Sequence, residues 1–340
     1  MDDGPIEHAI EHEVEETVRD PLARRWTPRR IILQLLGFLV GIALFAWAVV
    51  MATAEDNRIY IERIIEAPPR LLIGLIALTV LSIVFNALCF WAVVRPIKRL
   101  STIDVISVNA ISTVLSILPF KVSVLSRAFI HYRRDGIGIR DLVSWFAAMS
   151  ALSLAALLPA LGATLWRGQA DLLWWISAIG GPILCTALGV GVCMKLNHWR
   201  IIRIASIGGW RLLRFPAIGA EQLLYRFIDL VGLAGRFWIG SRIIGLDLSL
   251  DQGLLLGTGY FLSAVLAPAG ALGFAEMGAT ALGAAVGHDA GAVTSLALLI
   301  TASQFPTAFV MAIAGWFRLR PDRLLVSRAP AVTRPDAADA

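Results

Sequence analysis

The chain has 340 residues, of which 57% are hydrophobic and only 16% are charged, and its mean hydropathy is +0.73. Because soluble globular domains are about 25% charged, this composition excludes an ordinary soluble domain. The net charge of +5 comes from basic clusters that flank apolar blocks, so it indicates a membrane bilayer as a partner and no nucleic acid.

Five long apolar blocks contain no Asp, Glu, Lys or Arg. A helix crosses the roughly 30 Å hydrocarbon core of a bilayer with about 20 residues, and each block reaches that length. The alternative is a soluble domain with five fully buried long helices, which blocks of this length disfavour. We therefore predict an all-α integral membrane protein with spanning helices at residues 31–54, 71–94, 142–163, 172–194 and 290–317.

Polar tails flank the apolar region. Residues 1–30 are acidic and then basic, and we expect a flexible cytoplasmic tail. His8 to His12 read HAIEH, which fits the H-x-x-E-H spelling of some zinc proteases. Neither a third ligand nor a cleft accompanies this spelling, so we predict a solvated tail, no metal site and no other cofactor. Residues 318–340 are predicted to form a second, basic tail.

The basic residues indicate the orientation. Most of the 30 Lys and Arg residues lie before the first block, after the second, within 121–140, within 195–214 and in the final tail. The positive-inside rule assigns such segments to the cytoplasm. We predict a multi-pass protein of the cell (inner, or cytoplasmic) membrane with both termini in the cytoplasm.

Residues 221–242 have the length of a span but contain Arg226, Asp229 and Arg236. At 100° per residue these side chains fall on one face of a helix. Each charge at the middle of a span costs about 2.5–3.5 kcal/mol, so this face must be buried against protein or water. Arg226 and Asp229, three residues apart, are placed to compensate each other. Arg236 is left without a local partner.

Residues 101–120 are too short and too polar for an ordinary span. Asn109 and Ser116 share one helical face, which we expect to line a polar cavity or to contact other helices. The apolar stretch ends at Pro119, and the next twenty residues are basic. The simplest path enters the membrane from the cytoplasm and turns back at Pro119, with Arg127 eight residues further on.

A second interrupted segment covers residues 251–289. Pro268, Gly270 and Gly273 break its apolar run, and Glu276 follows. Irregular backbone at membrane depth is tolerated only where protein or water satisfies it. A lone carboxylate there needs a cation, a cationic ligand or water. We expect a broken hairpin that enters from the outer face.

The order of elements recurs with opposite polarity. Two spans, a re-entrant hairpin and a span occupy residues 31–163, and the same order follows in residues 172–317, as in an inverted-topology repeat. Together they form a predicted transmembrane domain of residues 31–317. The two hairpins are expected to meet near the middle of the membrane with Arg127 and Glu276 close together. The pattern leaves open whether these two residues form a substrate site or a structural ion pair.

At these two stretches the chain resembles the lysylphosphatidylglycerol synthase and flippase-like membrane family, including stand-alone members without the aminoacyl-transfer domain. The residues that match are Leu118, Pro119 and Arg127 in the first half and Pro268, Gly270, Gly273 and Glu276 in the second. Ser123 and Val124 stand where family members often carry Gly-Glu. Over roughly residues 30–320, the resemblance implies a domain that translocates or binds lipid. Because only a short tail follows the last block, we do not expect lysyl transfer.

The leading hypothesis is a flippase for a phospholipid or a lipid-linked precursor, without enzymatic activity of its own. In it, Arg127, Arg236 and Arg226 bind phosphate, while Glu276 contacts a cationic group such as an amine. Asp229 orients the arginines or carries a proton. The alternatives are a membrane-embedded lipid-modifying transferase or hydrolase, with Glu276 or Asp229 as its base, and a non-transporting accessory subunit. The sequence leaves open a homo-oligomer or a membrane protein partner.

Overall fold

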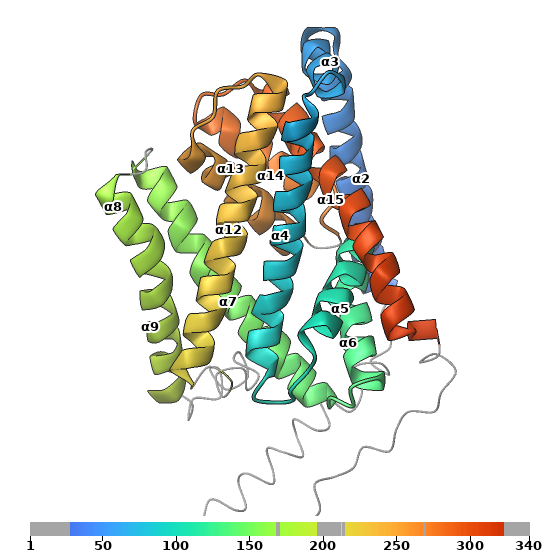
Figure 1. Cartoon of the computed structure of the whole chain (residues 1–340), viewed down its shortest axis with the longest axis vertical. Coiled ribbons are helices and arrows are strands. Elements are labelled where there is room, and N and C mark those ends of the chain that lie inside the picture. The colour runs from blue at the N-terminus through green and yellow to red at the C-terminus, as the bar shows by residue number, and fades with distance from the viewer. Residues whose placement is uncertain (1–27, 168–170, 196–211, 213–214, 268–269, 323–340) are drawn as a thin grey trace, which may run out of the picture.

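The computed structural model describes residues 28–167, 171–195, 212, 215–267 and 270–322. Every regular element in these ranges is helical (Figure 1). The tail predicted at residues 1–30, with its HAIEH stretch, and nearly all of the tail at 318–340 lie outside the described residues. The α-helices are α2 (Pro28–Thr53), α3 (Arg58–Ile65), α4 (Pro69–Val94), α5 (Thr102–Val114), α6 (Val122–Arg133), α7 (Ile139–Arg167), α8 (Leu172–Trp175), α9 (Gly181–Lys195), α12 (Pro216–Ile244), α13 (Leu250–Leu266), α14 (Phe274–Ala285) and α15 (Ala290–Leu319).

Five helical segments of the described chain are long and apolar enough to cross a membrane. Their outer faces expose large apolar side chains, as Leu39, Val50 and Phe309 illustrate, and such surfaces are stable against lipid. These segments coincide with the five apolar blocks, which confirms the prediction of an all-α integral membrane protein. They are Ile31–Thr53, Pro69–Val94, Ile139–Arg167, Leu172–Lys195 and Ala290–Leu319.

Helix α12 packs along α4 in the middle of the bundle (Figure 1). Gly232 lies against Leu81 of α4, where the absent side chain permits close approach. The charged face predicted for this helix is buried, since Arg226, Asp229 and Arg236 are 1%, 4% and 2% exposed. The prediction that this face lies against protein or water, and not against lipid, is confirmed.

The first break follows α5. A 3₁₀ turn at Leu115–Ile117 leads to Leu118, whose ψ of 149° is extended. Pro119 explains this conformation, because the proline ring clashes with a helical residue before it. Phe120 and Lys121 then take the left-handed conformation, with φ of 63° and 52°, before α6 begins. The break predicted at Pro119 is therefore confirmed.

The second break separates α13 from α14. Ala267 has an extended ψ of 129°, as expected before a proline, although Pro268 itself lies outside the described residues. Gly273 precedes α14 with φ of 79°. A Cβ atom there would lie 2.0 Å from the Gly41 carbonyl oxygen and 2.8 Å from the Phe45 nitrogen, both in α2. Glycine is thus required at position 273 both by its conformation and by the contact with α2.

The two breaks meet. The Ala271 N–H donates to the Ser116 carbonyl oxygen at 3.4 Å, and Gly270 packs against the same turn. The Lys121 ammonium donates to the Val265 carbonyl oxygen at 3.3 Å. In Figure 1, α5 and α6 occupy the lower part of the bundle and α13 and α14 the upper part. Segments about 150 residues apart in the sequence therefore share one region of the structure.

Candidate functional site

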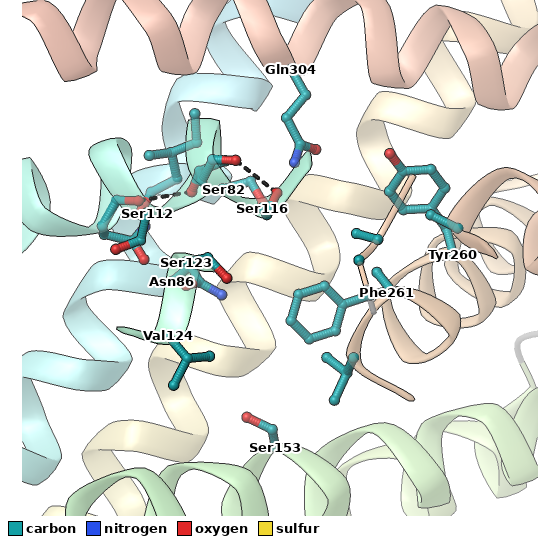
Figure 2. A pocket seen from close by; sticks show the side chains of 18 of the residues that line it. Ser82, Asn86, Ser112, Ser116, Ser123, Val124, Ser153, Tyr260, Phe261 and Gln304 are labelled. Atoms are coloured by element: carbon teal, nitrogen blue, oxygen red, sulfur yellow. Dashed lines mark hydrogen bonds between the residues drawn. The ribbon is translucent and has the colours of Figure 1, made fainter. Parts of the chain in front are cut away.

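A cavity of about 490 Å³ lies where the two breaks meet. Figure 2 shows Gln304, Phe261 and Ser153 pointing into the same space from α15, α13 and α7. Its polar lining also includes Ser82, Asn86, Asn109, Ser112, Thr113, Ser116 and Ser123. The sequence-predicted residues Asn109 and Ser116 thus line the cavity, together with Arg127, Arg226, Arg236, Gly270 and Glu276.

Arg127 enters the cavity from α6 and is 9% exposed. Its Nη2 donates to Asn109 Oδ1 at 2.6 Å, and its guanidinium lies 3.6 Å from the centre of the Phe90 ring. Asn109 is held in turn by a hydrogen bond from its Nδ2 to the Ile83 carbonyl oxygen at 2.9 Å. The Nη1 of Arg127 is buried without a hydrogen-bond partner. Arg127 is therefore fixed in place with one donor group still free.

Arg226 carries the one buried ion pair recorded among the described arginines of α12. Its Nη1 donates to Asp229 Oδ2 at 2.7 Å, and its Nη2 donates to Ser153 Oγ at 3.2 Å. Asp229 also accepts a hydrogen bond from Ser82 Oγ at 2.5 Å. Asp229 stands behind Arg226 and is not itself part of the cavity lining. The compensation predicted for Arg226 and Asp229 is confirmed, and the Arg226 Nε remains without a partner.

Arg236 is held by neutral groups. Its Nη1 and Nη2 donate to Gln304 Oε1 at 3.2 and 3.1 Å, and Nη2 also donates to the Ile300 carbonyl oxygen at 3.0 Å. No carboxylate pairs with it in the described part of the chain, and its Nε lacks a partner. The prediction that Arg236 lacks a local counter-charge is confirmed.

Glu276 is 1% exposed and accepts two hydrogen bonds. Its Oε2 accepts from the Gly273 backbone N–H at 2.8 Å, and its Oε1 accepts from Thr301 Oγ1 at 2.5 Å. It forms no ion pair with Arg127, which contacts Asn109 and the Phe90 ring instead. The structural ion pair that the sequence left open is therefore not formed, although both side chains line one cavity. Glu276 instead caps the N-terminus of α14, where backbone N–H groups and the helix dipole favour negative charge.

The cavity carries an excess of positive charge. Its cationic lining residues are Lys121, Arg127, Arg226 and Arg236. Against them stand Glu276 and, behind Arg226, Asp229. Three of the guanidinium groups retain a buried N–H without a partner, and a buried donor left unpaired costs about 1–3 kcal/mol. An anion with several oxygen acceptors would satisfy these donors.

Several lining residues were missed by the sequence analysis. Tyr260 and Phe261 lie on α13, Gln304 lies on α15, and Asn86 lies on α4. Each is a single polar or aromatic residue inside an apolar block. Such residues also occur in helices that line no cavity, so their presence alone does not indicate a site. Gln304 offered the best available signal, because it is an amide in mid-span just before Pro306.

The described ranges contain no cluster of three or more His, Cys, Asp or Glu side chains that could hold a metal ion.

The family model for the lysylphosphatidylglycerol synthase TM region matches residues 34–314. Searches of curated proteins and of solved structures gave no match. The matched range contains both breaks and every residue of the cavity lining. Because the match covers most of the sequence, the chain belongs to the family of membrane proteins defined by the lysylphosphatidylglycerol synthase TM region.

Proposed function

We propose that this protein moves a lipid with a phosphate-bearing headgroup between the two leaflets of the membrane, through the cavity at the two breaks. One observation carries this proposal: three buried arginines line the same cavity, and each has an N–H group without a hydrogen-bond partner. Guanidinium groups bind phosphate oxygens in a forked geometry. The family's name, which refers to a phospholipid, supports a lipid as the substrate.

In this proposal the headgroup occupies the cavity while the acyl chains stay in the bilayer. Arg127, Arg226 and Arg236 bind the phosphate, and Asp229 keeps Arg226 oriented through their 2.7 Å hydrogen bond. The amine contact that the sequence suggested for Glu276 stays a prediction: each carboxylate oxygen accepts one hydrogen bond and keeps a second lone pair. The protein makes and breaks no covalent bond in the lipid.

We also propose that α5–α6 and α13–α14 are re-entrant hairpins of an inverted repeat. Helices of 13, 12, 17 and 12 residues are too short to cross a core of roughly 30 Å at 1.5 Å per residue. The two hairpins occupy opposite halves of the bundle in Figure 1, and their breaks contact each other. Rocking of one half against the other would expose the cavity to each leaflet in turn.

Reconstitution tests the transport function. Purified full-length protein is placed in phosphatidylcholine vesicles that contain acyl-labelled phosphatidylglycerol, and albumin extracts the label from the outer leaflet over time. We expect label from the inner leaflet to become extractable with the parent protein. Arg127→Ala and Arg236→Gln should slow this exchange roughly tenfold each, because each removes charge-assisted hydrogen bonds to the phosphate.

Two comparisons make the result specific. Arg58→Ala removes an arginine that is exposed on α3, and it should exchange label like the parent. Arg127→Lys keeps the positive charge but cannot form two parallel hydrogen bonds to one phosphate. Its rate of label exchange should therefore fall between those of the parent and Arg127→Ala. Equal exchange by parent, Arg127→Ala and Arg236→Gln would overturn the site. Chemically altered lipid, detected by mass spectrometry, would favour a lipid-modifying enzyme instead.

A further inference from the structure

We propose that Glu276, in the wall of the cavity, is a proton-binding site whose hydrogen bonds extend through the hydroxyls of Thr301 and Tyr260, and that its protonation strengthens the binding of an anionic headgroup. The headgroup half of this inference rests on the proposed function. The proton-binding half stands on the geometry around Glu276 alone.

The first observation is a buried carboxylate without a cation. Glu276 is 1% exposed, and its recorded partners are the Gly273 N–H at 2.8 Å and the Thr301 hydroxyl at 2.5 Å. No Lys, Arg or His of the described chain forms an ion pair with it. Burying an unpaired negative charge is costly even when neutral groups donate hydrogen bonds to it. Binding a proton removes the charge while every other contact can stay in place.

The second observation is a chain of hydroxyls that leads away from the carboxyl group. Thr301 Oγ1 lies 2.5 Å from Glu276 Oε1 and 2.8 Å from the Tyr260 hydroxyl. Figure 2 shows Tyr260 in the wall of the cavity. Each hydroxyl has one hydrogen to donate and can accept another. With Glu276 charged, Thr301 donates to the carboxylate and Tyr260 donates to Thr301.

A proton on Oε1 reverses this chain. Glu276 then donates to Thr301, and Thr301 donates to Tyr260. The Tyr260 hydroxyl hydrogen is released and can point toward the contents of the cavity. The Gly273 N–H still donates to Oε2, so the turn before α14 need not change. Protonation of Glu276 therefore alters the cavity wall without moving the backbone.

The charges around Glu276 explain why its protonation should change the affinity of the cavity for an anion. The ionisable side chains that share its cavity are Lys121 and Arg127 from the first break and α6, Arg226 and Arg236 from α12, and Tyr260 from α13. Helix α2 meets the start of α14 at Gly41 and Phe45, and its ionisable residues, Arg29 and Arg30, lie in its first turn. Helix α15 contributes Gln304, which does not titrate. Protonation of Glu276 thus adds one unit of positive charge to a cavity that is already cationic.

Proton and anion should therefore favour each other's binding. One unit charge about 10 Å from an anion, at an effective dielectric constant of about 20, changes affinity by roughly tenfold. Thermodynamic linkage makes the effect reciprocal, so a bound anion raises the affinity of Glu276 for the proton by the same factor. A pH difference across the membrane would then bias the direction of lipid movement.

Infrared spectroscopy tests the proton site without any lipid assay. Difference spectra of the full-length protein in detergent are recorded between acidic and alkaline pH. The parent should show a C=O band of a protonated, buried carboxyl group that is lost at alkaline pH and is missing in Glu276→Gln. Thr301→Val should shift this band, because it removes the hydroxyl partner. Glu62→Gln, which removes an exposed carboxyl on α3, should keep it. Identical bands in parent, Glu276→Gln and Thr301→Val would overturn the site.

Transport of acyl-labelled phosphatidylglycerol across a pH series tests the coupling. The parent should exchange label roughly tenfold faster at pH values where the infrared band is present than where it is absent. Glu276→Gln, which is permanently neutral, should be independent of pH. A parent-like pH response in Glu276→Gln overturns the coupling. A parent that moves no label at any pH overturns the proposed function and the headgroup half of this inference, while the infrared band decides the proton site.

Discussion

The Asp229 carboxylate satisfies two partners inside the bundle, Arg226 at 2.7 Å and Ser82 at 2.5 Å. Replacing it by Asn removes the counter-charge of a guanidinium group that is 1% exposed. Breaking a buried ion pair from one side costs about 3–5 kcal/mol, because the remaining charge stays buried. We predict that Asp229→Asn lowers the free energy of unfolding by that amount, measured by chemical unfolding in detergent micelles.

An exposed ion pair provides the matched control. Asp247 pairs with Arg242 at 3.3 Å, and its side chain is 89% exposed. Asp247→Asn should change the free energy of unfolding by no more than about 0.5 kcal/mol. Equal losses for the two variants would show that burial of Arg226 has no energetic consequence.

Alanine substitutions at Gly273 and Gly287 distinguish the cost of backbone strain from the cost of steric overlap with neighbouring atoms. Both have positive φ, 79° and 90°, but only Gly273 has close neighbours, whereas a Cβ atom at Gly287 would meet nothing within 4 Å. We predict that Gly287→Ala costs about 1–2 kcal/mol, the strain of a left-handed residue. Gly273→Ala should cost clearly more, because its Cβ would overlap the backbone of Gly41. Thermal unfolding of both variants measures the difference, and equal costs would contradict the contact between this turn and α2.

For individual residues, the sequence predicted the relative positions of charged side chains on one helix. It did not predict which side chains on different helices contact each other. The spacing of Arg226, Asp229 and Arg236 was enough to place them on one buried face, because helical geometry relates residues three and ten apart. The partners of Glu276 could not be predicted in this way. Thr301 belongs to a different helix, and only the packing of α14 on α15 brings the two side chains together.

One carboxylate joins three parts of the chain, namely α5, the segment after α6 and the end of α15. Asp104, in the first turn of α5, accepts from Arg134 Nη2 at 2.8 Å, just after α6, and from Arg318 Nε at 2.6 Å, near the end of α15. Partly exposed ion pairs each contribute about 0.2–1 kcal/mol. Together they should restrain the first hairpin against the last helix.

We predict that Asp104→Asn makes the cavity more accessible. Labelling of a Ser112→Cys variant by a water-soluble maleimide, in a background without Cys89, Cys185 and Cys193, should become about two- to fivefold faster when this restraint is lost. Glu62→Gln, which breaks the exposed pair with Arg58, should leave the labelling rate unchanged. An unchanged rate in Asp104→Asn would show that these ion pairs do not restrain the hairpin.

Apolar blocks predicted where helices lie, but not their ends or their irregularities. The block at 142–163 belongs to α7, which extends over Ile139–Arg167 because its polar ends continue the helix beyond the apolar core. The block at 172–194 contains a π-helical segment at Ile176–Gly180 that no periodicity indicated. Pro119 marked a break correctly because proline restricts the preceding residue whatever the tertiary context.

For the whole molecule, the predicted order of spans and hairpins determines on which side of the membrane each connecting segment lies. Ser101 and Arg140 lie on either side of the first hairpin; Asp247 lies just before the second, and Ala285 is its last residue. In the cysteine-free background, we predict that Ser101→Cys and Arg140→Cys react with an impermeant maleimide from the cytoplasmic side. Asp247→Cys and Ala285→Cys should react from the opposite side. Labelling of Asp247→Cys and Ser101→Cys from the same side would exclude the inverted arrangement.

Phosphate binding in the cavity can be seen directly in an experimental density map of the full-length protein in nanodiscs that contain phosphatidylglycerol. We predict headgroup density in the cavity of about 490 Å³, with phosphate oxygens within hydrogen-bond distance of Arg127 and Arg236, and loss of that density in Arg127→Ala. An arginine cavity that contains only water, with lipid headgroups confined to the outer surface of the bundle, would contradict it.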